Sequence, residues 1–249
     1  MNIVFDVDGT ICFNGQYIEE ALAAQIKELQ QHHNIIFASA RPIRDLLPVV
    51  KAFNSQLLIG GNGSIVQHKD EIEVVGLIDK HIFKHIQQII SQYHLHYIID
   101  DDFNYSSNLS SDYTIFKQLD PEQLAQNISI EDIEHPIKII LVDIPQDIYH
   151  DLKTSMQSLS EELSLNFHDN ERNIDITAQN INKYTTLIKY LGNEDYIAFG
   201  NDINDIQLLN HAAQEFFIGS ETNRQSLNLS HLNMIEPNPQ LISRQINRI

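Results

Sequence analysis

Two carboxylates at the end of a short apolar run constrain this chain more than any other feature. Residues 3–5 are apolar and lead directly into Asp6 and Asp8, which Gly9 and Thr10 follow. A short apolar run that ends in polar residues is typical of a buried parallel strand. Open α/β sheets bind their ligands at the carboxyl ends of such strands. Since residues i and i+2 share one face of an extended chain, both carboxylates can reach one small volume, where a cation or a proton must offset their charge.

The residues after the aspartates are compatible with an anion site or with a plain turn. Gly9 lets the chain turn sharply and lets backbone N–H groups approach an anion. Asp and Gly are also ordinary turn residues, so a solvated turn is the alternative.

The charge balance excludes some classes of partner. The 249 residues carry 34 acidic and 16 basic side chains, a net charge of −18, so we expect no nucleic-acid partner. In this field an anionic substrate needs a bound cation and a few local basic groups. Since no apolar run is long enough to span a bilayer, we expect no membrane partner either.

Two further features bear on location. The opening residues lack the basic and small-residue segments of a signal peptide. The single cysteine, Cys12, excludes an internal disulfide framework and is interpreted as a small residue at the edge of the core. Both features predict a cytoplasmic protein. The length of the chain allows one large domain or two modest ones.

A second predicted strand ends in a candidate anion site. An amphipathic helix of about 18–32 precedes an apolar strand at 34–38, which ends at Ser39 and Arg41. Ser donates one hydrogen bond and Arg several, and Pro42 can begin a helix whose N-terminus adds positive potential. A capping Ser beside a solvated Arg fits this stretch equally well in isolation.

The βαβ pattern continues into a hairpin and then changes. A helix of about 43–53 and a strand at 56–59 lead to the tight turn at 60–63, and 64–67 with 71–75 predict a hairpin. From about residue 79, helices alternate with short strands of mixed polarity, which predicts an α+β insert with a half-exposed sheet. Its predicted helices are 80–92 and 146–159, and its strands are 95–99, 137–142, 163–167 and 173–176.

One polar stretch of the insert, from Asp100 to Asp112, predicts a solvated loop. The run Asp100-Asp101-Asp102 within it is the alternative, a metal-binding cluster. The histidines show no ligand spacing with an acidic third partner nearby.

The βαβ pattern resumes after the insert. Lys183 opens a helix, where the helix dipole disfavours a cation, so its position requires an anionic neighbour unless it is simply solvated. A strand at 195–199 then ends in the polar run 200–205, which opens another helix. Shorter strands at 215–218 and 231–235 and a helix near 239–247 complete the prediction.

Taken in order, these strand-end groups resemble the haloacid dehalogenase superfamily. The resemblance covers nearly the whole chain, and the paired D-x-D-G-T and G-N-D-x-N-D motifs make it specific. The Cof-like branch, whose cap is inserted between the second and third motifs, is the best match. The groups that carry it are Asp6 with Asp8, Ser39 with Arg41, Lys183, and 201–205.

The resemblance assigns roles to these residues. Asp6 would be the nucleophile that forms an aspartyl-phosphate, and Asp8 the general acid and base. Mg²⁺ would be held by Asp6, the backbone carbonyl of Asp8 and the loop that contains Asn201, Asp202 and Asp205. The second Asp of the first motif indicates a phosphatase or mutase, not a dehalogenase. The predicted phosphate-binding residues are Thr10, Ser39, Arg41, Asn62, Lys183 and Asn204.

The chain departs from the commoner family pattern at two places. Asn201 stands where G-D-G-x-N-D usually has a carboxylate, and Asp202 stands in place of the glycine. An amide oxygen ligates Mg²⁺ without charge, so the site either binds the metal more weakly or recruits Asp202 or Asp205. Ser39-Ala40-Arg41 replaces the commoner T-G-R but keeps its hydroxyl and guanidinium.

The expected fold is α/β, a doubly wound, mostly parallel Rossmann-like core sheet with an inserted smaller α+β cap domain. The core would comprise residues 1–78 and 176–249, and the cap 79–175. The expected activity is Mg²⁺-dependent hydrolysis of a small phosphorylated metabolite, a phosphate monoester and most plausibly a sugar phosphate, by a monomer or weak homodimer. A sugar phosphomutase with the same nucleophile is the alternative enzyme. A phosphorelay receiver also combines an acidic cluster, a Ser/Thr and a Lys, but it needs only about half this length and no insert.

Overall fold

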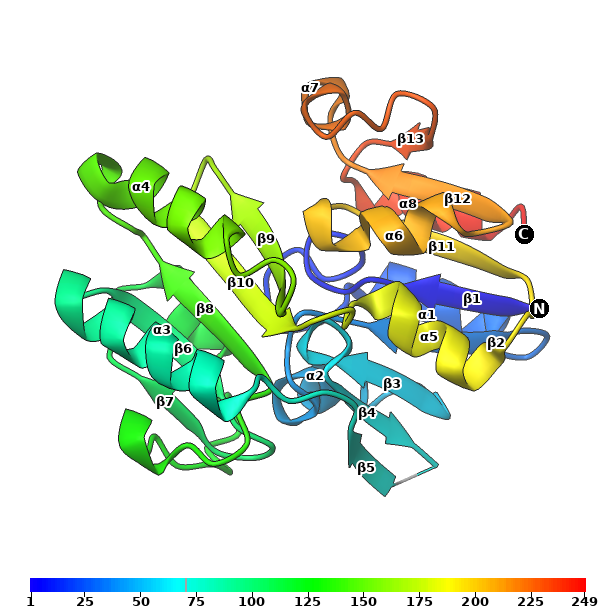
Figure 1. The fold of residues 1–249 in the computed structure, drawn as a ribbon. Coiled ribbons are helices and arrows are strands. Elements are labelled where there is room, and N and C mark those ends of the chain that lie inside the picture. The colour runs from blue at the N-terminus through cyan, green and yellow to red at the C-terminus, as the bar shows by residue number, and fades with distance from the viewer. Residues whose placement is uncertain (70) are drawn as a thin grey trace.

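The computed structural model describes residues 1–69 and 71–249, and within them the chain forms two sheets that lie side by side (Figure 1). The larger sheet has the strand order β13-β12-β11-β1-β2-β3-β4-β5. Its neighbours pair in parallel from β13 to β3, and the β3–β4–β5 end is antiparallel. The strands are β1 (Asn2–Phe5), β2 (Asn34–Ala38), β3 (Leu57–Gly60), β4 (Ile65–His68), β5 (Glu71–Val74), β11 (Tyr196–Gly200), β12 (Gln214–Ile218) and β13 (Asn233–Ile235).

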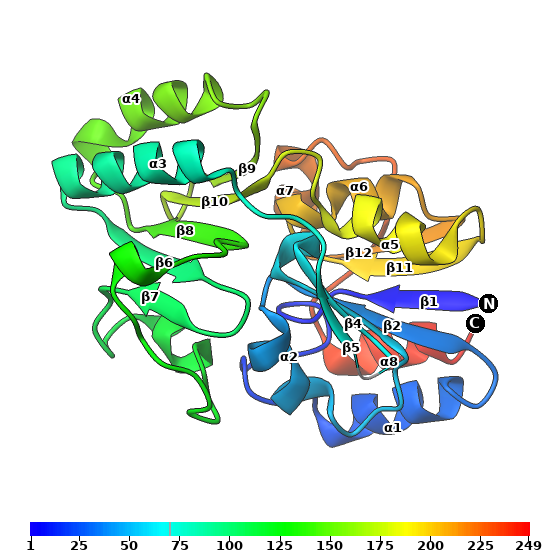
Figure 2. The same cartoon turned by 60° about the horizontal axis from the view of Figure 1, so that its bottom comes forward.

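Helices cover both faces of this sheet, which makes it doubly wound (Figure 2). Because side chains alternate along a strand, Ile3 and Phe5 of β1 face one helix layer and Val4 faces the other. The first layer is α1 (Glu20–Leu29), α2 (Ile43–Val50) and α8 (Pro239–Ile246), and the second contains α5 (Lys183–Leu191) and α6 (Ile206–Asn210). The short α7 (Glu221–Ser226) follows β12. The predicted α/β fold class is therefore confirmed.

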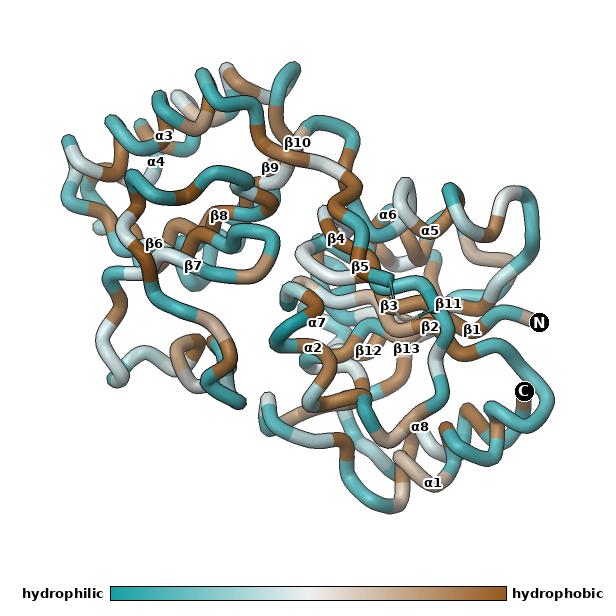
Figure 3. Tube along the Cα trace, turned by 90° about the horizontal axis from the view of Figure 1, so that it is seen from below, coloured by the Kyte–Doolittle hydropathy of each residue, from teal (hydrophilic) through white to brown (hydrophobic). Residues whose placement is uncertain are grey.

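The second sheet is antiparallel, with the order β7-β6-β8-β10-β9. Helices α3 (Lys80–Tyr93) and α4 (Gln146–Gln157) pack on one of its faces, and their alternating colours in Figure 3 reflect amphipathic sequences. Its strands are β6 (His96–Asp100), β7 (Tyr105–Ser107), β8 (Lys138–Val142), β9 (Leu163–His168) and β10 (Asn173–Ala178). Residues 79–178, which carry this sheet, are here called the cap, and the eight-stranded sheet with its helices is the core.

The two faces of the cap sheet differ in polarity. Ile139 and Leu141 of β8 pack with α3 and α4, whereas Lys138 and Ile140 lie on the opposite face. That opposite face also carries Asp175 of β10, and Lys138 reaches a backbone carbonyl of the core. The prediction of a half-exposed sheet is therefore wrong for β8, which is buried along its whole length because Ile140 and Val142 pack in a second apolar cluster. The part of this face that carries Lys138 and Asp175 is directed at the core and is called the polar face.

The chain enters and leaves the cap at one place. A side chain added at Gly76, on the way in, would lie 2.6 Å from Ile181 and 3.5 Å from Ala178, on the way out. Strand β10 extends across residue 176, where the sequence predicts the return to the core, and ends at Ala178. The segment that enters the cap therefore lies in contact with the segment that leaves it.

The prediction of a solvated loop from Asp100 to Asp112 is wrong at its beginning. Asp100 and Asp101 are buried, Asp100 ends β6, and β7 lies within the stretch. Asp100 accepts a hydrogen bond from Arg44, and Asp101 accepts one from the His135 backbone, so both carboxylates have partners that offset burial.

None of the helices in the described part of the chain is both long and apolar enough to cross a membrane.

Candidate functional site

Asp6 lies at the carboxyl end of β1, between the ends of β2 and β11. It is buried, and its backbone N–H donates to the Phe199 carbonyl at 2.9 Å, which fixes the turn to the neighbouring strand. The Thr10 hydroxyl donates to Asp6 Oδ2 at 2.7 Å, and Lys183 Nζ donates to Asp6 Oδ1 at 2.6 Å. The structure therefore holds both carboxylate oxygens in a fixed orientation.

Lys183 is the buried cation of the site. Its ammonium lies 2.6 Å from Asp6 Oδ1 and 2.7 Å from Asp205 Oδ1, and its side chain has no exposed surface. Burial opposes its charge, but Asp205 and then Asp6 raise the pKa of Lys183 above its ordinary value. Burial, followed by the charge of Asp205, raises the pKa of Asp6, while Lys183 acts in the opposite direction. The anionic neighbour that the sequence requires for Lys183 is therefore present twice.

Asp8 is paired with Arg41 through two hydrogen bonds. Arg41 Nε donates to Asp8 Oδ2 at 2.7 Å and Nη2 donates to Asp8 Oδ1 at 2.6 Å. Arg41 also donates to the Gly15 carbonyl at 2.7 Å, so its guanidinium is directed at the first-motif loop. The side chain of Asp8 keeps 33% of its surface exposed. Asp8 thus remains accessible from the space between core and cap, and Arg41 orients it.

The other predicted phosphate-binding residues form a connected group. Ser39 is fully buried, and its hydroxyl oxygen accepts from the Arg41 backbone N–H at 3.1 Å. Asn62, in a left-handed conformation with φ 57°, donates through Nδ2 to Asp175 of the cap at 3.1 Å. Asn204 donates to Asn62 Oδ1 at 3.0 Å. Two of the predicted residues therefore connect the site to the cap sheet.

The loop after β11 is organised around Asp205. Asp205 is fully buried; its Oδ2 accepts from the backbone N–H groups of Asn201 (2.9 Å) and Asp202 (3.2 Å), and its Oδ1 accepts from Lys183. Asp202 caps the following turn, with its Oδ1 accepting from the Ile203 N–H, and its Oδ2 lies 3.4 Å from His168 Nδ1 of the cap. Burial raises the pKa of Asp202. The carboxylates of Asp202 and Asp205 are therefore both engaged by groups of the loop itself, by Lys183 or by the cap.

The Asn201 amide lies beside Asp6 and Asp8. Its oxygen accepts from the Thr10 hydroxyl at 3.1 Å and lies 2.9 Å from Asp6 Oδ2 and 3.0 Å from the Asp8 carbonyl oxygen, so three oxygens converge at these spacings. If the amide turns, its nitrogen takes the same place and donates to both of those oxygens. An octahedral Mg²⁺ site with ligands at 2.0–2.1 Å has edges of about 2.9 Å, and its ligands are hard oxygens. The donor set of Asp6, the Asp8 carbonyl and Asn201 therefore fits Mg²⁺.

Comparison with known proteins shows the family of this chain. The model of the haloacid dehalogenase-like hydrolases matches residues 3–228. The chain belongs to this family. Among curated proteins the hydrolase has no match.

Solved structures show the same fold as this hydrolase at low sequence identity. One is a sugar phosphatase of haloacid dehalogenase subclass IIB, with 17% identity, a TM-score of 0.79, and coverage of 99% of this chain and 98% of that one. Another is a haloacid dehalogenase-like hydrolase of B. subtilis, with 13% identity, a TM-score of 0.81 and coverage of 100% and 99%. A Thermotoga maritima protein has 18% identity, a TM-score of 0.76 and coverage of 100% and 97%.

The cap contributes residues that the sequence analysis did not select. Lys138 of β8 and Asp175 of β10 form an ion pair of 3.3 Å on the polar face of the cap sheet, with side-chain exposures of 2% and 9%. His168 of β9 lies 3.8 Å from Asp175. The available signal was a charged residue at an alternating position within an apolar run, as in Lys138-Ile-Ile-Leu-Val and Asn-Ile-Asp175-Ile.

Two adjoining cavities lie between core and cap. The smaller, of about 150 Å³, reaches Asp8 and Arg41. The larger, of about 680 Å³, is bounded by the 201–204 loop and by the polar face of the cap sheet. Ala40, Ile115, Lys138 and Ile140 line both cavities. The space beside the carboxylates is therefore large enough for a small molecule.

Proposed function

We propose that this hydrolase cleaves a small phosphate monoester, most plausibly a sugar phosphate, through an aspartyl-phosphate on Asp6. The observation that carries the proposal is the fixed Asp6 carboxylate, held between Thr10 and Lys183, with Asp8 two residues further on and facing a cavity. Lys183 and the buried Ser39 are suited to hold phosphate oxygens as charge develops during transfer.

The proposed reaction uses two carboxylates, those of Asp6 and Asp8. An oxygen of Asp6 attacks the phosphorus while the bond from phosphorus to the ester oxygen breaks, and Asp8 donates its proton to the departing alkoxide. Asp8 then takes a proton from water as the water attacks the phosphorus of the aspartyl-phosphate. That step releases inorganic phosphate and restores Asp6. Arg41 orients the ionised Asp8, and one of its two hydrogen bonds must open when Asp8 carries the proton.

The proposed cofactor is Mg²⁺, held by Asp6, the Asp8 carbonyl and Asn201. When bound, it would supply positive charge that offsets the phosphate and the Asp6 carboxylate. Asp202 and Asp205 have been predicted as ligands, but their oxygens accept from backbone N–H groups and face His168 or Lys183. We therefore assign them the role of shaping the loop that presents Asn201.

The remaining predictions concern the surroundings of this site. We propose that the cap of about 79–178 sets substrate choice, because it lines both cavities while the catalytic carboxylates belong to the core. The partner would be a small phosphorylated metabolite, the location cytoplasmic and the assembly a monomer or weak homodimer.

A panel of phosphate esters, including p-nitrophenyl phosphate and hexose phosphates, tests the proposal. Purified protein should release inorganic phosphate in Mg²⁺ and lose this activity in EDTA. Asp6→Asn should lower kcat at least about a hundredfold, ~2.7 kcal/mol of barrier, because an amide is a poor nucleophile. A loss below about tenfold would exclude Asp6 as the nucleophile. Transfer of phosphate to a second sugar, in place of its release, would indicate the mutase alternative.

A further inference from the structure

The larger cavity between core and cap is where the non-phosphate part of a substrate must lie. It adjoins the smaller cavity that reaches Asp8, and the two share a wall formed by Ala40, Ile115, Lys138 and Ile140. Its volume of about 680 Å³ is within the range of small-molecule sites. A leaving group that departs beside Asp8 therefore projects toward the polar face of the cap sheet.

The described side chains that line this cavity are mostly hydrogen-bonding groups, and their formal charge is negative. Amides and a hydroxyl come from both core and cap, among them Asn173, Asn204 and Ser226. One permanent cation, Lys138, and the imidazole of His168, which faces Asp175 and Asp202, line it together with four carboxylates, those of Asp169, Glu171, Asp175 and Asp202.

The cation of this lining is already engaged. Lys138 Nζ lies 3.3 Å from Asp175 and donates to the Ala40 carbonyl at 2.9 Å, with 2% of the side chain exposed. Asp169 is paired with Lys153. Within the described part of the chain, Glu171 has no basic partner and Asp202 has only His168. A second anionic group on the substrate would meet like charge here and no free ammonium or guanidinium among these lining residues.

We propose that the cavity accepts a leaving group rich in hydroxyls and rejects one that carries a second anionic group. This inference rests on the phosphatase function proposed above. Hydroxyls can donate to the carboxylates and accept from the amides, whereas a carboxylate or second phosphate is repelled at close range. Selection through repulsion of the wrong ligand is a common source of specificity.

A matched pair of open-chain hexose phosphates tests this. Sorbitol 6-phosphate and 6-phosphogluconate differ at C1, where one carries a hydroxymethyl group and the other a carboxylate. Each is titrated as a competitor of p-nitrophenyl phosphate hydrolysis at constant free Mg²⁺, so that binding is measured even without turnover. The inhibition constant of 6-phosphogluconate should be at least about tenfold higher, ~1.4 kcal/mol.

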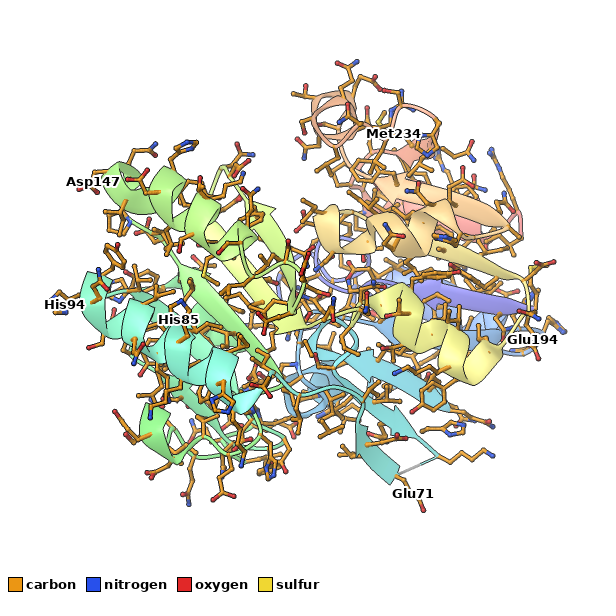
Figure 4. The ribbon with its side chains drawn as sticks, in the orientation of Figure 1. Glu71, His85, His94, Asp147, Glu194 and Met234 are labelled. Atoms are coloured by element: carbon orange, nitrogen blue, oxygen red, sulfur yellow. The ribbon has the colours of Figure 1, made fainter. Side chains whose placement is uncertain are left out.

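The Lys138–Asp175 ion pair provides a sharper test, because removing one partner should change the ratio of the two inhibition constants in the opposite direction from removing the other. Asp175→Asn frees the charge of Lys138, so the ratio of the two inhibition constants should fall at least about threefold. Lys138→Met leaves Asp175 unpaired, so the ratio should rise. Asp147→Asn, the same substitution at a site on the outer end of α4 (Figure 4), should leave it unchanged. A general disturbance of the cap changes both constants by one factor and leaves the ratio constant.

Each outcome decides a separate point. Equal inhibition constants in the wild type, failure of both compounds to compete, or an unchanged ratio in a folded Asp175→Asn variant would overturn the inference while leaving the phosphatase intact. If Lys138→Met does not fold, as a thermal melt will show, Asp175→Asn alone decides. Absence of p-nitrophenyl phosphate turnover in Mg²⁺ would overturn the proposed function itself, and the inference with it.

Discussion

Lys183 shows how a single residue can determine the chemistry of this site. An ammonium at the start of a helix is unfavourable, and burial adds to that cost. Asp6 and Asp205 offset it from two directions, so the three groups hold one another in fixed positions. Asp205 also accepts from two backbone N–H groups of the 201–205 loop, so its carboxylate joins Lys183 to the loop that presents Asn201.

In the proposed Mg²⁺ site, Asn201 is the residue at which metal affinity should be tunable. Asn201→Asp places a carboxylate opposite Asp6 Oδ2 and the Asp8 carbonyl, so it should tighten the apparent Mg²⁺ dissociation constant at least about tenfold. The same substitution without Mg²⁺ crowds two carboxylates and should lower the melting temperature. Titration of both activity and melting temperature with Mg²⁺ measures the effect.

Asn210→Asp provides the control for that experiment, because it adds the same charge at an exposed position on the neighbouring helix α6. It should leave the Mg²⁺ titration unchanged. If Asn201→Asp also leaves it unchanged, or weakens it, residue 201 does not ligate the metal.

Helix α2 and strand β6 are joined by a buried group of charges. Arg44 of α2 donates to Asp45 on its own helix at 2.7 Å and to Asp100 at the end of β6 at 3.1 Å. It also donates to the Phe103 carbonyl of the cap, and Asp45 accepts from the Asp120 N–H at 3.0 Å. These contacts fasten one side of the cap to the core.

Arg44→Met should loosen that attachment. Removing one partner leaves Asp45 and Asp100 buried without their cation, which typically costs about 3–5 kcal/mol. For a chain of this size we expect the melting temperature to fall by at least about 6 °C. Lys51→Met is the control, because the Lys51–Glu122 pair also joins core and cap but is 68% and 44% exposed, and such pairs contribute at most about 1 kcal/mol. Equal shifts for the two variants would contradict a clamp at Arg44.

The sequence predicts helices and strands well where apolar residues follow a regular pattern. It predicts burial poorly where charged residues pair with partners far away in the chain. The largely apolar run 137–142 and the helical period in 80–92 predict β8 and α3 to within about a residue. Asp100 was predicted to be solvated, because its partner Arg44 is 56 residues away in the chain. The strand ends placed Asp6 and Asp8 together, but the pairing of Asp8 with Arg41 depends on how two loops of the core meet. The approach of His168 to Asp202 depends on how core and cap meet.

The whole molecule separates a chemical part from a part that surrounds the substrate. The carboxylates belong to strand ends of the core, and the cap sheet lies beside these strand ends (Figure 1). The polar face of the cap sheet lines the larger cavity between them. A cover of this kind excludes water and contacts the non-reacting part of a substrate. Under the proposed function, the core would need the cap for substrate binding and not for the nucleophile.

Replacing residues 79–178 with a short flexible linker tests that separation. Turnover of p-nitrophenyl phosphate should remain measurable, because Asp6, Asp8 and Lys183 all remain. Activity on the best ester of the panel should fall at least tenfold further, about 1.4 kcal/mol, since its leaving group loses the cap contacts. Circular dichroism must show a folded core, because the deletion exposes apolar surface. Equal losses on both substrates would contradict the proposed separation.

The close approach of the two connections at Gly76 has a consequence for how such genes can diversify. Because the inserted block enters and leaves beside one glycine, two recombination breakpoints a few codons from Gly76 and Ile181 would exchange the block as a unit. A donor block fits as long as its own ends lie equally close together. New specificities can then arise by transplantation, without the many coordinated point mutations that remodelling a pocket inside the eight-stranded sheet would require.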